Sequence, residues 1–293
     1  MYFSRVRIKQ GINELSILAD MFRQDQYAVH RMLWRLFPEQ DERTFLYREE
    51  IAREQLAVSA TVRGEPIYYV VSQFKPVEND DSLFKVETKP YQPQLEVGQR
   101  LIFECRVNPV VDRQGKKHDV VMDAQWRFLS DLVETLHLQA LLSSKPNKGE
   151  YKKLLLSNGG EPLNQYLTQV LANDPSYAER LSQIANLADK LEWATKVQID
   201  KALENWWCRQ GERCGFDLVH DQNGSSKLQN SGYYWHALPQ KVKKKGDKSG
   251  FSTVDLTGEL QITDIDKFQH TLFNGLGRAK AFGCGLVMVK KVN

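Results

Sequence analysis

The stretch GLGRAKAFGCG, residues 275–285, is the part of the chain from which its fold is most readily inferred. It holds four glycines and two cations, Arg278 and Lys280. A run with helical periodicity (264–274) precedes it, and a strand-like run (286–289) follows it. The pattern predicts a helix, a glycine loop and a closing strand near the C-terminus.

Glycine-rich loops often bind phosphate, because glycine permits positive φ and leaves backbone amides uncovered. A Walker A loop opens a helix, whereas this loop closes one. A dinucleotide fingerprint needs a glycine three residues after Gly277, where Lys280 stands. A helix C-cap with a tight crossover remains the alternative to a phosphate site. Nucleic acid is then the phosphate ligand to consider, with these candidate contacts: Gly275, Gly277, Arg278, Lys280, Gly283 and Gly285.

Composition sets broad limits on the function. The 293 residues suffice for two domains, or for one domain with a large insertion, and 41% apolar and 26% charged residues are ordinary for a soluble protein. With a net charge of only +3, a nucleic-acid surface needs local clustering of cations. Four cysteines without metal-ligand spacing fit a reducing cytoplasm. We expect a cytoplasmic location and no membrane contact, because signal-peptide features and 18-residue apolar runs are missing.

The N-terminal part, residues 1–93, has the element order of a ferredoxin-like half. Alternation predicts a first strand over 2–8, and a helix over 25–36 ends at Phe37-Pro38. Further strand-like runs follow at 44–48, 55–62, 67–71 and 83–87. A proline-containing linker at 89–93 separates this half from the next.

The second half, residues 97–293, repeats a similar order of elements around a helical block. We expect strands at 100–107 and 252–256, a hairpin tip at 112–117, the helix at 264–274 and the final strand. Three apolar stripes of helical period predict a helical insertion over 123–192, whose default role is scaffold or partner docking. The third stripe runs from Leu181 to Leu191, and another helix is expected over 194–213.

A lysine-rich stretch, residues 240–250, is a second candidate contact for nucleic acid. Lysine runs are often only solvated loops. Because the chain also holds the glycine loop suited to phosphate, this run favours a contact with RNA or DNA. Its lysines are Lys241, Lys243, Lys244, Lys245 and Lys248.

The helix over 25–36 carries the residues best suited to chemistry. At about 100° per residue, one face gathers apolar residues for the core, and the opposite face gathers Tyr27, His30, Arg31 and Trp34. We expect this second face to be exposed. Tyr27 lies one turn before His30, so Tyr27 could orient a target while His30 moves a proton. An exposed histidine without function is the alternative. No histidine spacing indicates a metal site, so we expect neither a metal nor another cofactor.

Several of these stretches together resemble a known family. The run YAVHRMLWRLFP (27–38), the N-terminal strand, the segment 103–109 and the loop 275–285 are similar to the CasE family. Its members are the CRISPR repeat-processing endoribonucleases of the type I-E Cascade complex. The resemblance covers residues 1–121 and 194–293.

The resemblance implies an α+β fold with two tandem ferredoxin-like, RRM-related domains, here with a helical insertion in the second. It also implies metal-free cleavage of precursor CRISPR RNA beside a repeat hairpin, leaving a 2′,3′-cyclic phosphate and a 5′-hydroxyl. By this resemblance His30 is the general acid/base, Tyr27 is its partner, and a lysine from 240–250 stabilises the phosphorane. Which lysine does so stays open among Lys243, Lys244, Lys245 and Lys248.

The expected partners are precursor and mature guide RNA and the other Cascade subunits, especially the backbone subunit. Arg31, Trp34, the lysine-rich stretch and the glycine loop are the expected RNA contacts, with Tyr27 and Trp34 stacking on an unpaired base. Two alternatives remain. One is a non-catalytic RNA-binding subunit of a CRISPR ribonucleoprotein, and the other is an adaptor whose helical insertion carries the function.

Overall fold

The computed structural model describes residues 1–9, 27–51, 66–78, 83–222, 224–237 and 250–292. The chain divides into two compact units. The sheet unit comprises Met1–Asn108, Gln210–Val219 and Lys227–Asn293, and the helical unit comprises Pro109–Arg209 and His220–Ser226. The helices of the described residues include none whose length and apolar content would let it span a lipid bilayer.

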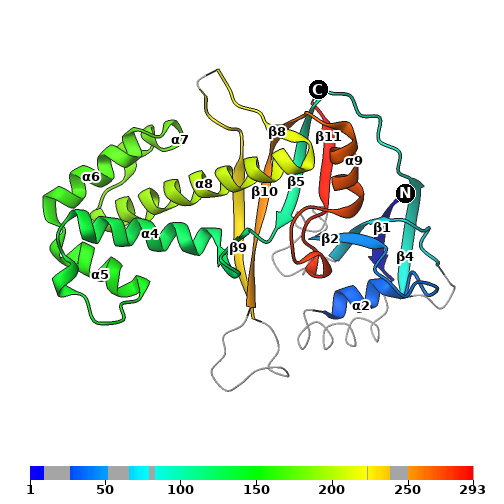
Figure 1. The fold of residues 1–293 in the computed structure, drawn as a ribbon, viewed down its shortest axis with the longest axis horizontal. Coiled ribbons are helices and arrows are strands. Elements are labelled where there is room, and N and C mark those ends of the chain that lie inside the picture. Colours follow the sequence, from blue (N-terminus) through cyan, green and yellow to red (C-terminus); the bar gives the residue numbers. More distant parts are fainter. Residues whose placement is uncertain (10–26, 52–65, 79–82, 223, 238–249, 293) are drawn as a thin grey trace. The chain divides into compact units, whose positions relative to one another are not determined.

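The first sheet has the strand order of a ferredoxin-like domain. Its antiparallel strands follow the order β2-β3-β1-β4, and α2 connects β1 to β2 (Figure 1). The bounds are β1 (Tyr2–Ile8), α2 (Ala28–Trp34), β2 (Phe45–Ile51), β3 (Pro66–Ser72) and β4 (Phe84–Pro90).

The predicted first strand is confirmed residue for residue, and the runs at 44–48, 67–71 and 83–87 fall on β2, β3 and β4, each shifted by a few residues at its ends. The run at 55–62 lies outside the described residues.

The second sheet repeats this order, with strands β11-β5-β10-β8 all antiparallel and β9 also paired to β10. Its elements are β5 (Arg100–Val107), β8 (Phe216–Leu218), β9 (Gln229–Ala237), β10 (Gly250–Ile262), α9 (Ile265–Asn274) and β11 (Val287–Lys291). The strands predicted at 100–107 and 252–256 lie on β5 and β10, and the strand predicted at 286–289 overlaps β11, which begins at Val287. Neither β8 nor β9 was expected.

Local sequence explains both ends of α9. The Asp264 side chain accepts a hydrogen bond from the Lys267 N–H, which caps the first turn. Phe268 and Leu272 are buried, as the apolar stripe predicts. Gly275, with φ +76°, stops the helix.

The two ferredoxin-like sheets meet within the sheet unit. On one face of the first sheet, Met32 and Leu33 of α2 pack into a cluster with Tyr68 of β3. A second cluster joins Leu46 and Val71 to Leu286, which follows the glycine loop. The fold is therefore α+β with two ferredoxin-like domains, as predicted. The domain boundaries at 93 and 97 stay a prediction.

The helical unit interrupts the second domain between β5 and β8. It begins with a hairpin of β6 and β7, and its core consists mainly of leucines from four helices, among them Leu132, Leu155, Leu167 and Leu191. The helices are α4 (Val120–Thr135), α5 (Lys148–Asn158), α6 (Gly160–Ala172), α7 (Pro175–Ala178) and α8 (Leu187–Cys214), with β6 at Val110–Arg113 and β7 at Lys116–Asp119.

The third apolar stripe of the insertion is not one helix. A 3-10 turn covers Leu181–Gln183, and α8 then begins at Leu187 and continues for 28 residues. The Asn186 side chain accepts a hydrogen bond from the Asp189 N–H and so caps the start of α8. The helix expected from 194 therefore begins seven residues earlier.

Candidate active site

The short helix α2 presents the two residues predicted to carry chemistry. Tyr27 is its N-cap, and His30 lies in its first turn. Tyr27 is 42% exposed, but His30 is only 5% exposed. The prediction that His30 is exposed is therefore wrong. Strand β2 packs against the imidazole and buries it, whereas Arg31 on the same helix face is exposed.

Aromatic rings surround the His30 imidazole. It stacks on Phe45 with ring centroids 5.2 Å apart, and the edge of Trp34 lies against it at 5.3 Å. The Tyr27 ring stands at 87° to the imidazole with centroids 5.5 Å apart. Tyr47 completes the cluster at 6.3 Å. The imidazole is thus fixed by packing, as a precisely positioned proton-transfer group needs to be.

Burial determines the protonation state of His30. Loss of hydration, and then the positive charge of Arg43, lower the pKa of the imidazole to about 4. Its Nδ1 atom is buried and has no hydrogen-bond partner among the residues that the structure describes. The ring is therefore neutral at pH 7 and able to accept a proton. An unpaired buried nitrogen costs stability, which is a feature found at functional sites.

The glycine loop completes this site from the other domain. A 3-10 turn at Lys280–Phe282 places the Phe282 ring 4.9 Å from Tyr27, edge to face. The Tyr47 hydroxyl donates a hydrogen bond to the Ala281 carbonyl oxygen at 3.0 Å. The loop and α2 are thus brought together, although some 250 residues separate them in the chain.

Most glycines of the loop serve its shape. The N–H groups of Gly275, Gly283 and Gly285 donate to backbone oxygens of Thr271, Lys280 and Arg106. A Cβ on Gly285 would lie 2.3 Å from the Leu276 oxygen, and one on Gly275 would meet Leu46. The helix C-cap alternative therefore describes Gly275. Gly277 is exposed, with φ +72°, and apart from its chain neighbours no described residue comes within 4 Å of an added Cβ.

The cations predicted to bind RNA differ in their exposure to solvent. Arg31 and Arg278 are exposed. Lys280 is half-buried and donates to the Asn274 oxygen at 2.7 Å, and burial, then the charge of Arg43, lower its pKa.

Trp34 is half-buried too, and its Nε1 donates to the Gln40 oxygen, so its packing role is larger than expected. Lys241, Lys243, Lys244, Lys245 and Lys248 lie outside the described residues.

Sequence reasoning missed Arg43 and Phe282. Arg43 is exposed, and its charge lowers the pKa of both His30 and Lys280, so it adds positive charge around the imidazole. No spacing marks it, although it lies just before β2. Phe282 stood inside the glycine loop without an assigned role. It also contacts Phe251 on β10 at 4.5 Å, which extends the aromatic cluster towards His236.

Among the described residues, no three side chains of His, Cys, Asp or Glu gather closely enough to hold a metal ion.

Comparisons with known proteins assign the chain to a family. A family model described as "CRISPR associated protein" matches residues 1–291. A search of curated proteins gives no match.

Among solved structures, a CRISPR endoribonuclease Cse3 bound to 19 nt RNA is similar with a TM-score of 0.58 and 19% identity, covering 99% of this chain and 100% of the other. Cse3 of Thermus thermophilus bound to an RNA representing a pre-cleavage complex has a TM-score of 0.54 and 19% identity, covering 99% and 98%. A CRISPR-associated protein from Thermus thermophilus has a TM-score of 0.52 and 20% identity, covering 99% and 100%.

At these identities the structural likeness shows a shared fold. The family model covers nearly the whole chain, including the helical insertion. The chain therefore belongs to the family of CRISPR associated proteins.

Proposed function

We propose that this protein is an endoribonuclease that cleaves precursor CRISPR RNA within the repeat, beside its hairpin. The observation that carries the proposal is the fixed pair of Tyr27 and His30, with Phe282 of the glycine loop packed edge to face against Tyr27. Membership of the CRISPR associated family and the resemblance to CasE support the same substrate. So do the two similar Cse3 structures, which contain RNA.

The proposed reaction is a metal-independent transesterification. The ribose 2′-oxygen upstream of the scissile bond attacks phosphorus, and the bond from phosphorus to the 5′-oxygen breaks. The 2′-hydroxyl proton passes to the neutral His30 imidazole, and the leaving 5′-oxygen takes a proton from solvent water. His30 then releases its proton to solvent, so that no net proton is gained or lost. The products are a 2′,3′-cyclic phosphate and a 5′-hydroxyl.

The environment of His30 supports the role of a base. A pKa of about 4 keeps the ring neutral at pH 7, although it makes the ring a weak base. An approaching phosphate anion stabilises the protonated ring and so raises this pKa during the reaction. Tyr27 is the exposed member of the pair, and it therefore meets the RNA first.

Cations near the site are proposed to bind the backbone and stabilise the phosphorane. The charge of Arg43 lowers the pKa of His30, so this cation is close enough to influence the site. Arg278 and Arg31 are exposed and therefore accessible to the RNA backbone. A lysine from 240–250 remains a candidate for the same role. Hairpin RNA is bound mostly through phosphate and shape, so such local charge suffices despite a net charge of +3.

We further propose that the protein stays bound to the mature guide RNA as a Cascade subunit, next to the backbone subunit, in the cytoplasm. The resemblance to CasE supports these partners.

A non-catalytic RNA-binding subunit is the second candidate function. The observation that favours it is the burial of His30, because a ring that is only 5% exposed is poorly accessible to substrate. Under this function the imidazole only fills an aromatic core.

The two functions are separated by incubating the purified protein with its cognate repeat RNA in EDTA. The wild type and a His118→Ala control are expected to cleave. His30→Ala is expected to bind the RNA and leave it intact. His30→Phe preserves the ring packing, so its inactivity separates lost chemistry from lost structure.

Cleavage by both His30 variants would contradict the proposal, as would loss of wild-type activity in EDTA. Tight binding by the wild type with intact RNA would establish the second candidate.

A further inference from the structure

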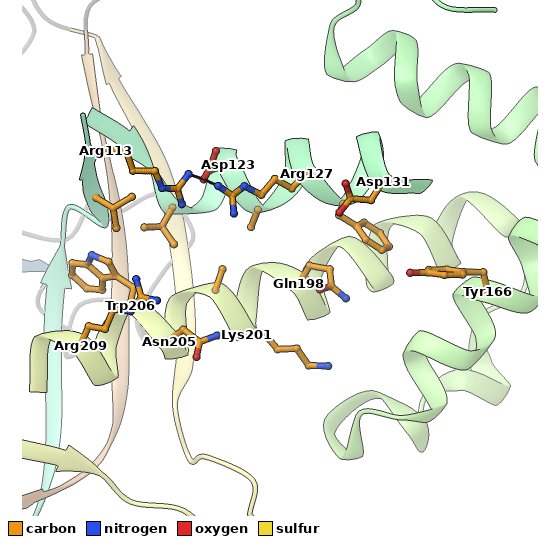
Figure 2. A pocket seen from close by; sticks show the side chains of 15 residues that line it. Arg113, Asp123, Arg127, Asp131, Tyr166, Gln198, Lys201, Asn205, Trp206 and Arg209 are labelled. Carbon is orange, nitrogen blue, oxygen red and sulfur yellow. Dashed lines mark hydrogen bonds and ion pairs between the residues drawn. The ribbon is translucent and has the colours of Figure 1, made fainter. Parts of the chain in front are cut away.

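The helical unit contains a cleft that the proposed cleavage reaction does not use. It lies between α4 and α8 and has a volume of about 440 Å³, and its lining residues in the described part of the chain all belong to the helical unit (Figure 2). Its lining residues recur along both helices over about eleven positions, which corresponds to roughly 16 Å of groove. We propose that this cleft binds a short segment of single-stranded nucleic acid.

The charge of the cleft favours an anion. Four cations line it, against two carboxylates, Asp123 and Asp131. A third carboxylate, Asp174, lies 3.8 Å from the Lys201 ammonium, so the group keeps a surplus of one positive charge. The cations come from both walls: Arg113 from β6, Arg127 from α4, and Lys201 and Arg209 from α8 (Figure 2). A polyanion that runs between the walls contacts positive charge on either side.

An ion-pair network orients two of the arginines. One carboxylate oxygen, Asp123 Oδ2, contacts Arg113 Nη1 at 2.6 Å and Arg127 Nη2 at 3.3 Å. Two guanidiniums thus share one carboxylate, which leaves a surplus of one positive charge. Each guanidinium has five N–H donors, so both keep donors for phosphate oxygens.

Planar polar groups accompany the charge. Gln198 and Asn205 line the same face of α8, with amide groups that match the edges of bases. Tyr166 of α6 stands at one end of the cleft and is 39% exposed, which suits stacking on a base (Figure 2).

The same lining argues against a peptide as the ligand. Peptide grooves depend on exposed apolar or aromatic anchor sites. Here Trp206 is buried and its Nε1 donates to the Val110 oxygen, while Val120 and Phe128 are buried as well. Among the lining residues, Tyr166 is the large hydrophobic side chain that is exposed.

The test measures binding of a fluorescein-labelled oligouridylate, too short and uniform to form a hairpin, to the full-length protein by anisotropy across a salt series. The test variant is Arg127→Gln/Lys201→Gln, which removes one exposed cation from each wall. The matched control is Lys145→Gln/Lys153→Gln, which removes two exposed lysines of the same unit outside the cleft. Thermal melting checks that both variants fold.

The test variant is expected to bind on the order of tenfold more weakly, while the control binds like the wild type. Its slope of log K against log salt is expected to fall by about 1.4, because each phosphate contact to a single strand contributes about 0.7. Unchanged affinity and slope in the test variant would overturn the proposal.

A second measurement localises the contact. Photocrosslinking of a 4-thiouridine-substituted strand, followed by peptide mapping, is expected to label peptides of α4 and α8. Crosslinks confined to the sheet unit would overturn the proposal even if binding weakened.

An oligothymidylate arm compares DNA with RNA. Crosslinking of either strand in the cleft supports the proposal, and a preference for RNA assigns a contact to the 2′-hydroxyl. The proposal does not depend on cleavage, so His30→Ala is expected to retain these crosslinks.

Discussion

The site at Tyr27 and His30 and the cleft in the helical unit differ in almost every physical respect. His30 is packed among rings, is 5% exposed and is held neutral by burial. The cleft is lined by exposed charges, such as those of Arg127 and Lys201, each more than half exposed. Salt screens the interactions of such charges with a ligand. The difference suggests a division of roles within the chain: burial tunes one group for proton transfer, while exposed charge binds a strand.

The largest expected effect tests this division by comparing how a variant of each region cleaves the same RNA. His30→Ala is expected to lower single-turnover cleavage of a bare repeat hairpin by about 10²- to 10⁴-fold, the usual loss for a general acid–base group. Arg127→Gln/Lys201→Gln is expected to cleave that hairpin within about twofold of the wild type, because its charges lie outside the proposed reaction. A large loss in the cleft variant would mean that the two regions act as one site.

The next effect concerns the loop that closes over Tyr27. Gly285→Ala is expected to reduce the free energy of unfolding by about 3 kcal/mol, because its φ of +86° is combined with a clash against the Leu276 oxygen. Gly277→Ala, at φ +72° with open space, is the control and is expected to cost about 1 kcal/mol. Chemical denaturation measures both. Equal losses would show that the close approach at Gly285 is unimportant.

A smaller effect follows from the buried imidazole. Burial lowers the pKa of folded His30 to about 4 from an ordinary 6.5, so the unfolded chain binds more protons between these values. His30 therefore contributes stability above pH 6.5 that is lost as the pH falls towards 4, about 2 kcal/mol by pH 5. His30→Phe is expected to lack this loss when the free energy of unfolding, measured by chemical denaturation, is compared above pH 6.5 and at pH 5. An identical pH dependence in wild type and variant would mean that His30 is not buried in solution.

The smallest effect belongs to the cleft. Asp123→Asn removes the carboxylate shared by Arg113 and Arg127, and is expected to raise affinity for oligouridylate at low salt by about twofold. Glu134→Gln, an exposed change at the end of α4, is the control. Weaker binding by Asp123→Asn would show that the carboxylate mainly orients the arginines.

Much of the sheet unit could be predicted because its elements carry local signals. The strand Tyr2–Ile8 is indicated by alternation within its own seven residues. The ends of α9 are likewise indicated by single residues, the N-cap Asp264 and the C-cap Gly275. In contrast, β9 was missed because it begins with polar residues and exposes Tyr233, Tyr234 and Trp235, so burial imposes no alternation on it. The start of α8 depended on the Asn186 cap, which periodicity alone does not reveal.

The candidate site was predicted in its residues but not in its environment. Tyr27 and His30 stand out by residue type and spacing. The burial of His30, however, depends on Phe45 and Tyr47 of strand β2, and the periodicity of α2 carries no information about a contact with another element. Arg43 and Phe282 become relevant only through tertiary contact. The cleft was not foreseen, because its lining alternates with core positions along α4 and α8.

The central claim is that the 2′-hydroxyl of the RNA is the nucleophile and His30 takes its proton. The most direct measurement is cleavage of repeat RNA in EDTA, with mass spectrometry of the product ends, beside a substrate that carries a single 2′-deoxy nucleotide upstream of the cut. We predict a 2′,3′-cyclic phosphate and a 5′-hydroxyl from the natural RNA and no cleavage of the deoxy substrate. Cleavage of the deoxy substrate at the same bond, or a product with a free 3′-hydroxyl, would contradict the account.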